Sequence, residues 1–194
     1  MSLKERVYSV LVVSSSEKFN QALPEAFPLP SFSPIKVVSN VSAAGRVTAE
    51  RDFDFVIVNS PLPDDTGVRF AIDTGNTGYT VVLFLAREEQ YSDAYDKLAE
   101  HGVFLMRKPV SRQMLQTSSE WLISARERVR KTEKKTLSIE EKMNEIRFVN
   151  RAKWLLITEL KMTEPDAHRY IEKQAMDRCV PRRSVAEEII KTYS

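Results

Sequence analysis

The sequence contains very little of the chemistry that builds disulfides or metal centres. Its 194 residues include one cysteine, Cys179, and two histidines. A single cysteine cannot form an internal disulfide, and this cysteine and histidine content is too small for a zinc cluster. We therefore predict no metal and no cofactor, and we expect Cys179 to be a small buried or half-buried side chain rather than a reactive thiol. His168 has no second ligand nearby and is expected to be a core or surface histidine.

Long apolar runs are also missing. No stretch approaches the roughly 20 apolar residues that a helix needs to cross a bilayer. The first residues, MSLKERVYSVLVV, pass from charged side chains into a short strand-like run without a cleavage-site pattern. These absences predict a cytoplasmic protein with no membrane partner.

The net charge of +2 is distributed unevenly along the chain. Residues 1–110 carry 11 Lys+Arg against 14 Asp+Glu, whereas residues 111–194 carry 18 against 13. Basic residues favour polyanionic partners through counterion release, so the C-terminal part is the one expected to bind any nucleic acid. The surface of a coiled coil has a similar charge pattern without such a partner.

The N-terminal part alternates short apolar segments with stretches of helical length. The apolar, β-branched runs predict five strands, at residues 7–13, 35–38, 53–58, 81–85 and 103–106. Such runs are typical of a parallel sheet with helices on both faces, so we predict an α/β domain. In these sheets, ligand and phosphate chemistry gathers at the carboxyl ends of the strands.

A long segment without glycine or proline follows, from Ser111 to Glu164. Apolar and small residues recur there at alternating spacings of three and four, which predicts a heptad seam with a weak middle at Thr132 and Thr136. A seam of this length favours a parallel coiled-coil homodimer over packing within one chain. The expected dimerisation residues are Leu115, Leu122, Val129, Ile139, Met143 and Ile146.

The C-terminal segment contains two further helix starts. Thr163 has the marks of an N-cap, followed by a proline and acidic residues in the first turn. A second start follows Pro181, where Ser184 to Glu187 has capping-box spacing. With the end of the long helix, these starts predict an all-α three-helix bundle. Its expected inward-facing residues are Leu156, Ala167, Tyr170, Ile171, Ala175, Met176, Val185, Ala186, Ile189 and Ile190.

Three short motifs occur in order in this bundle. They are Ala152-Lys153, Met162-Thr163-Glu164 and Ala175-Met176-Asp177, followed by Val185-Ala186 in the last helix. In order and spacing they resemble the ANTAR module, the three-helix RNA-binding domain of bacterial transcription antiterminators. The resemblance implies that Ala152 and Lys153 lie on the face that meets an RNA loop.

Other basic side chains of the bundle are candidates for the same interaction. RNA loops are recognised by stacking of bases on aromatic or guanidinium planes and by cations on the phosphates. Arg151, Arg178, Arg182 and Arg183 are therefore candidate RNA contacts beside Lys153. Trp154 stands where the family often has glycine, and we expect it to be a packing residue rather than a stacking platform.

A second resemblance covers about residues 5–125. The segments VYSVLVVSSSEKF, DFDFVIVNSPLPDDTG, TVVLFLAR and FLMRKPV resemble the signature segments of response-regulator receiver domains, which implies a flavodoxin-like five-stranded sheet. In that family, acidic residues after the first strand hold Mg²⁺, and an aspartate at the end of the third strand accepts a phosphoryl group. Here Ser14 and Ser15 stand in place of the acidic pair, Asn59 in place of the aspartate and Ala86 at the switch position, and only Lys108 is retained.

These replacements change the chemistry of the site. Serine hydroxyls and a neutral amide supply too little negative charge to hold Mg²⁺, and an amide is not a nucleophile. We therefore predict a pseudo-receiver that is not phosphorylated at the usual site. Lys108 is expected to bind Asn59 or a backbone carbonyl, and Asp64 and Asp65 are expected to be turn or N-cap residues rather than a substitute pocket.

The sequence thus predicts a non-enzymatic regulator in three parts: a pseudo-receiver at residues 1–123, a coiled-coil linker helix at 111–146 and an RNA-binding bundle at 143–194. Its expected partners are stem-loops of an mRNA leader, a second copy of the chain, and a regulatory protein or small ligand at the pseudo-receiver. The alternative is a protein-interaction adaptor that uses the pseudo-receiver and the coiled coil as docking surfaces. A phosphoryl-transfer enzyme is the weakest hypothesis.

Overall fold

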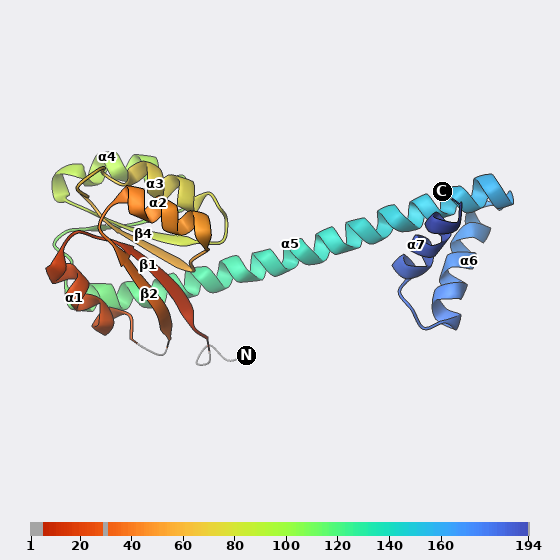
Figure 1. The fold of residues 1–194 in the computed structure, drawn as a ribbon, viewed down its shortest axis with the longest axis horizontal. Helices are drawn as coiled ribbons and strands as arrows, with labels where there is room; N and C mark the ends of the chain where they lie inside the picture. The colour runs from red at the N-terminus through yellow and green to blue at the C-terminus, as the bar shows by residue number, and fades with distance from the viewer. Residues whose placement is uncertain (1–5, 29–30, 194) are drawn as a thin grey trace. The chain divides into compact units, whose positions relative to one another are not determined.

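The computed structural model describes residues 6–28 and 31–193 and contains two compact units, shown in Figure 1. The first unit spans Met1–Lys131 and the second Thr132–Ser194. The first unit therefore extends beyond the boundary predicted at residue 123. Within the described residues, the helices include none that is both long and apolar enough to cross a membrane.

A five-stranded parallel sheet forms the centre of the first unit, with strand order β2-β1-β3-β4-β5. The strands are β1 (Tyr8–Val13), β2 (Phe32–Val38), β3 (Phe55–Asn59), β4 (Val81–Ala86) and β5 (Phe104–Arg107). All five predicted strands are present, and the predicted α/β class is confirmed. The continuous apolar runs of β1, β3 and β4 are explained by burial on both faces of the sheet, whereas the outer strands β2 and β5 are partly exposed.

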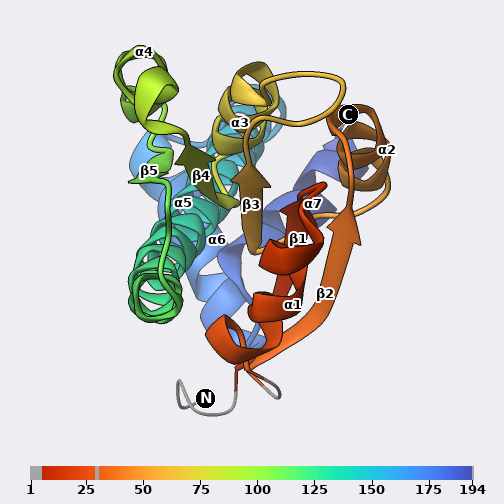
Figure 2. The same cartoon turned by 90° about the vertical axis from the view of Figure 1, so that its left-hand side faces the viewer.

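Helices cover the two faces of the sheet (Figure 2). The helices α2 (Val41–Glu50), α3 (Val68–Gly75) and α4 (Glu88–Ala99) pack on one face, and α1 (Glu17–Ala26) and α5 (Arg112–Leu160) pack on the other. Alternate strand residues divide between the two layers, because successive side chains of a strand point to opposite faces. Val56 and Val58 face α2 to α4, whereas Phe55 and Ile57 face α1 and α5.

The first part of α5 uses the predicted heptad seam to pack against its own sheet. Leu115 is 2% exposed and Leu122 is 1% exposed, and Val129 is half-buried beside them. The dimerisation role predicted for Leu115 and Leu122 is therefore wrong, since these side chains are buried within the chain. The later seam residues Ile139 and Met143 are exposed, as is Ile146.

A polar cluster also fixes α5 to the sheet, near the start of β3. The carboxylate of Asp54 accepts hydrogen bonds from the Ser9 backbone N–H at 3.0 Å, from Arg126 Nε at 2.9 Å and from Arg130 Nη2 at 2.8 Å. Burial raises the pKa of Asp54, but the Ser9 N–H and the two guanidinium groups outweigh it and hold that pKa below its ordinary value. The charged cluster thus anchors a helix whose apolar side chains already face the sheet.

The second unit consists of the end of α5 together with α6 (Glu164–Asp177) and α7 (Arg182–Tyr193). Thr163 is the N-cap of α6, as predicted, and its hydroxyl accepts from the backbone N–H of Asp166 at 3.4 Å. The last helix begins directly after Pro181, at Arg182, so Ser184 lies in its first turn and the predicted capping box is wrong.

The core of this unit contains most of the predicted residues. Its buried members are Ala152, Leu156, Ala167, Ile171, Ala175, Val185, Ala186 and Ile189. On α6 the buried face follows Ala167, Ile171 and Ala175 at a spacing of four, which places Tyr170 and Met176 outside it. Both were predicted to face inward, yet Tyr170 is exposed and Met176 is 76% exposed.

Cys179 is exposed rather than buried or half-buried as predicted. Its φ of 51° places it in the left-handed conformation that commonly follows the end of a helix. The Val180 N–H then donates to the Ala175 carbonyl at 3.0 Å, which closes the last turn of α6. This role could not be predicted from the sequence, because glycine or asparagine usually occupies such a position.

Candidate functional site

The residues predicted to replace the phosphorylation site do come together at the carboxyl edge of the sheet. Ser14 follows β1, Asn59 ends β3 and Ala86 ends β4, and all three are buried. The Asn59 side-chain N–H donates to Ser14 Oγ at 2.9 Å. The Lys108 backbone N–H donates to the Ala86 carbonyl at 2.8 Å, which holds the start of the Lys108 side chain beside them. Ser15 is exposed next to this group.

Lys108 lies at the centre of this edge. Its Nζ donates to the backbone carbonyl of Ser60, one of the two kinds of partner predicted for it. Burial, together with the positive charge of Arg87, lowers the pKa of Lys108 to about 8. The two effects have the same sign, because both penalise the ammonium form.

The oxygen donors at this edge do not fit Mg²⁺. The polar groups identified at this edge are the hydroxyl of Ser14 and the amide of Asn59, which bind each other, and the carbonyl of Ser60, which binds Lys108. Mg²⁺ prefers carboxylates among its protein ligands. Among the described residues, no group of three or more His, Cys, Asp or Glu side chains is placed to hold a metal ion.

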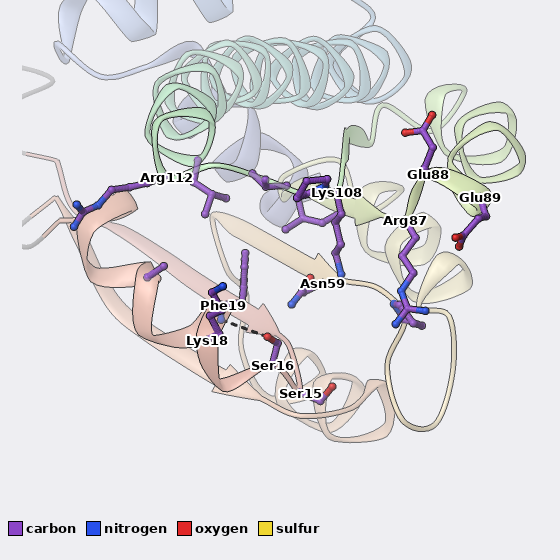
Figure 3. A pocket seen from close by; sticks show the side chains of 16 residues that line it. Ser15, Ser16, Lys18, Phe19, Asn59, Arg87, Glu88, Glu89, Lys108 and Arg112 are labelled. Carbon is purple, nitrogen blue, oxygen red and sulfur yellow. Dashed lines mark hydrogen bonds between the residues drawn. The ribbon is translucent and has the colours of Figure 1, made fainter.

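A cavity of about 820 Å³ opens beside Lys108 (Figure 3). It lies between the first turns of α1, the ends of β3 and β4, and the segment that leads from β5 into α5. Apolar side chains form one part of its wall, and charged side chains line the rest. Arg87 and Phe19 line this cavity but did not stand out in the sequence; the position of Arg87 directly after an apolar strand was the only available signal.

The two acidic residues of the Pro-rich loop have structural partners. The carboxylate of Asp64 accepts from the backbone N–H groups of Val41 and Ser42, each at 2.9 Å, at the first turn of α2. Asp65 Oδ1 accepts from the Gly67 N–H at 2.6 Å. These contacts agree with the predicted cap and turn roles, and neither residue lines the cavity.

The second candidate site lies in the C-terminal unit, where the Ala152-Lys153 pair divides between core and surface. Ala152 is completely buried in the bundle, so it is not available for the close contact with RNA that was predicted for it. Lys153 Nζ forms an ion pair with Glu164 Oε1 at 2.7 Å, and its side chain is 18% exposed. The hydrogen bond and the charge of Lys153 lower the pKa of Glu164.

Three of the four predicted RNA-contacting arginines also have carboxylate partners. Both terminal nitrogens of Arg178 bind Glu188, at 2.6 and 2.7 Å. Arg182 lies 3.3 Å from Glu145, and Arg183 lies 2.7 Å from Glu187. These pairs are at least partly exposed, so each is weak and open to exchange for a phosphate partner.

An exposed stripe on α5 provides a different surface. Arg147, Arg151, Trp154 and Thr158 recur at spacings of four, three and four, and all are exposed. Trp154 is 68% exposed, so the prediction that it packs in the bundle is wrong. The buried face of the helix passes through Ala152 and Leu156, which turns this tryptophan stripe towards solvent.

A groove borders the stripe. It has a volume of about 420 Å³ and is lined by Lys142, Glu145, Ile146, Val149, Asn150, Lys153, His168 and Arg182. Cations and amphipathic side chains therefore occupy two neighbouring faces of the same unit. His168 sits at the surface, where its Nε2 lies 3.3 Å from Glu172 Oε1.

Comparisons with known proteins bear on both units. Residues 138–190 match the ANTAR domain family. The chain is 29% identical over 140 residues to the transcriptional regulatory protein PdtaR of Mycobacterium tuberculosis. The aligned region covers 72% of this chain and 68% of that protein.

Solved structures resemble the first unit. One is the signal receiver domain of an HD domain-containing protein from Pseudomonas fluorescens, with a TM-score of 0.56 and 22% identity over 65% of this chain and 93% of that one. Another is a response regulator receiver domain from Clostridium thermocellum, with a TM-score of 0.54 and 19% identity over 62% of this chain and 97% of that one. At these identities the likeness shows the fold alone. The chain thus has a receiver-like α/β fold followed by a segment that matches the ANTAR domain family, and it is similar to a bacterial transcriptional regulator.

Proposed function

We propose that this protein is a non-enzymatic regulator that binds stem-loops in mRNA leaders and controls transcription antitermination. The observation that carries the proposal is the match of residues 138–190 to the ANTAR domain family, in a unit where the exposed Trp154 follows the exposed Arg147 and Arg151 on one face of α5. Splayed bases of RNA loops stack on aromatic and guanidinium planes, and cations bind the phosphates. Arg147, Arg151 and Trp154 supply these groups on one face of α5.

Electrostatic attraction alone is a weak basis for this binding. The second unit carries 13 Lys+Arg against 11 Asp+Glu, and several of its cations are paired with carboxylates. RNA phosphates compete with those carboxylates at small cost, because exposed ion pairs are weak. We therefore assign Trp154 a stacking role and assign Lys153, Arg151, Arg178, Arg182 and Arg183 contacts with the RNA backbone or loop.

We further propose that the receiver-like unit does not accept a phosphoryl group at the usual position. Asn59 presents an amide there, and its N–H is engaged with Ser14. An amide nitrogen is a poor nucleophile, and the surrounding oxygens carry too little charge to hold Mg²⁺ against a phosphoryl donor. Incubation with acetyl phosphate and Mg²⁺, followed by intact-mass measurement, should show no adduct. Control would then come from a regulatory protein or small ligand bound at this unit.

A homodimer of this chain could bind both hairpins of a leader RNA that contains two of them. The exposed residues Ile139, Met143 and Ile146 continue the heptad seam beyond the first unit. Pairing two chains along this stretch would place two RNA-binding domains on one assembly and raise the effective concentration of the second contact. We propose these three residues as the dimerisation surface.

A mobility-shift titration with a two-hairpin leader RNA tests the proposed function. Lys153→Ala should weaken binding several-fold and reduce the salt slope by about one ion, because one phosphate contact is lost. Glu164→Gln is the matched variant, since it removes the same ion pair but keeps the lysine. It should bind at least as tightly as the wild type. Equal losses in both variants would instead point to a structural role for the pair.

The alternative function is a protein-interaction adaptor. It is favoured by the pairing of Arg178, Arg182 and Arg183 with carboxylates and by the exposed apolar residues of α5. Salt dependence separates the two hypotheses, because only the RNA-binding protein should lose hairpin affinity steeply as salt rises. Lys36→Ala, on an exposed strand residue of the other unit, controls for unspecific effects of charge.

A further inference from the structure

We propose that the cavity beside Lys108 binds a small organic carboxylic acid, with its carboxylate against Lys108 and Arg87 and its apolar body against Phe19 and Val110. This inference deepens the proposed function and rests on its premise that the edge of the sheet does not accept a phosphoryl group. It replaces a general expectation of ligand control with a defined chemical class.

The cavity beside Lys108 carries positive charge that its acidic residues do not balance. Four cations line the cavity, at Lys18, Arg87, Lys108 and Arg112. Arg112 is paired with Glu25, outside the cavity lining. Lys108 donates to a neutral carbonyl, and among the described residues no carboxylate pairs with Lys108 or Arg87. An ammonium group has three donors, so Lys108 keeps N–H groups for an anion.

The acidic residues of the cavity do not neutralise these groups. Glu88 forms an ion pair with Arg107 at 2.8 Å. Glu88 and Glu89 lie in the first turn of α4, and Figure 3 shows their carboxylates turned away from Lys108 and Asn59. The centre of the cavity is therefore positive. The lowered pKa of Lys108 agrees with this, since its charge is half-buried and lies near the positive charge of Arg87.

Part of the wall of this cavity is apolar. The apolar residues that line the cavity include Phe19 and Ala22 of α1, Leu85 of β4, Val110, and Leu115 of α5. The volume of about 820 Å³ is within the range of sites that enclose drug-sized ligands. An inorganic anion would leave this apolar surface in water, whereas an acid with a hydrocarbon body covers it. Charge and shape together favour a monocarboxylate over free phosphate.

The position of the wall makes binding relevant to α5. Leu115 lies in the first turns of that helix, and Val110 lies in the segment that leads into it. Leu115 is almost completely buried, so a ligand would contact mainly Val110, which packs in the same apolar layer that attaches α5 to the sheet. Binding is thus expected to stabilise the docked helix, because a ligand that binds only the folded state raises its stability.

Calorimetric titration of the full-length chain tests the proposal. The probes are benzoate, phenylacetate and isovalerate at millimolar concentrations. Phenylacetamide is the neutral counterpart of phenylacetate, and inorganic phosphate is an anion that has no hydrocarbon part. We expect saturable binding of at least one acid and binding at least tenfold weaker for phenylacetamide and for phosphate. Lys108→Met and Arg87→Met should each weaken the acid at least tenfold, and Lys36→Met should leave it unchanged. Thermal unfolding of each variant verifies that it is folded.

The results also separate this inference from the function on which it rests. Absence of saturable binding across the three acids, equal affinity for phenylacetamide, or unchanged affinity in folded Lys108→Met would overturn the inference. Hairpin RNA binding is measured on the same preparations. If RNA binding persists while the acids fail, the ligand assignment alone is wrong. A phosphoryl adduct formed with acetyl phosphate would contradict the premise itself and remove the proposal.

Discussion

At the scale of single residues, Lys108 shows how burial and a neighbouring charge of the same sign alter a lysine side chain. Its ammonium group is half-buried, bound to a carbonyl and close to Arg87. Both the burial and the like charge penalise the protonated form in the folded state. The cost is absent from the unfolded chain, where the lysine has its ordinary pKa.

This cost predicts a pH dependence of stability with a defined sign. The folded-state pKa of Lys108 is lowered from 10.5 to about 8, so between these values the unfolded state binds more protons. Stability therefore rises with pH across this window, and the penalty is fully present below about pH 8. The measurement is chemical denaturation of the wild type and Lys108→Met at pH 7 and pH 10. From pH 7 to pH 10, the free energy of unfolding of the wild type should rise relative to that of Lys108→Met. A fall relative to the variant would contradict the lowered pKa of Lys108.

For three other residues, the sequence pattern predicted burial and the structure shows exposure. Trp154, Tyr170 and Met176 are large and apolar, and composition alone favours their burial. Their exposure follows from the small residues Ala152, Ala167 and Ala175, which form the contact face of the bundle and turn their neighbours outward. Which apolar stripe of a short helix faces inward depends on its packing partners, and the sequence of one helix does not contain that information.

At the scale of elements, α5 combines two different environments along one heptad pattern. Its first seam residues pack on the sheet, whereas Ile139, Met143 and Ile146 are exposed. The patterns of a coiled coil and of a helix packed on a sheet differ by only about 20° per heptad, so a few turns do not distinguish them. The strands were easier to predict because β-branched runs between turn residues have few other interpretations.

The exposed part of the seam predicts weak, concentration-dependent dimerisation. Three large apolar residues fall short of the three to four heptads that usually identify a coiled coil. Ile139→Glu should abolish the dimer, because it places like charges at a seam position. Leu137→Glu is the matched control, since Leu137 is exposed but lies off the seam. Sedimentation velocity over a concentration series provides the readout, and a dimer that survives Ile139→Glu would exclude this surface.

The Asp54 cluster predicts a second effect at this scale. Asp54→Asn leaves Arg126 and Arg130 without their shared carboxylate, and it should cost roughly 3 kcal/mol because these charges are largely buried. Asp73→Asn removes the exposed partner of Arg69 and should cost about 0–1 kcal/mol. Urea denaturation compares the two variants. Equal losses would show that the cluster contributes no more than a surface ion pair.

The pH dependence of the same cluster has a sign that follows from the lowered pKa of Asp54. Its contribution to stability is present above the ordinary pKa of an aspartate and is lost as pH falls through the lower folded-state value. The wild type should therefore lose stability relative to Asp54→Asn under acidic conditions. This comparison can be made with the same denaturation experiments.

At the scale of the whole molecule, the chain joins a receiver-like fold to an ANTAR domain. The sequence was sufficient for the five strands of the sheet, because they follow from local apolar runs, and the absence of acidic side chains at Ser14, Ser15 and Asn59 can be read from it directly. It was insufficient for the cavity, since Phe19, Arg87 and Val110 come together only through the parallel sheet order. The charge count also overstated the positive charge of the C-terminal unit, since residues 111–131 belong to the first unit.

The central claim is that the ANTAR domain binds RNA hairpins on the face that carries Trp154. The most direct test is the emission of Trp154 during titration with a two-hairpin leader RNA. Trp121→Phe leaves Trp154 as the only tryptophan, and Trp154→Phe leaves Trp121 as the control. We predict saturable quenching in Trp121→Phe that weakens as salt rises, and no quenching in Trp154→Phe. Unchanged Trp154 emission in low salt with excess RNA would contradict the claim.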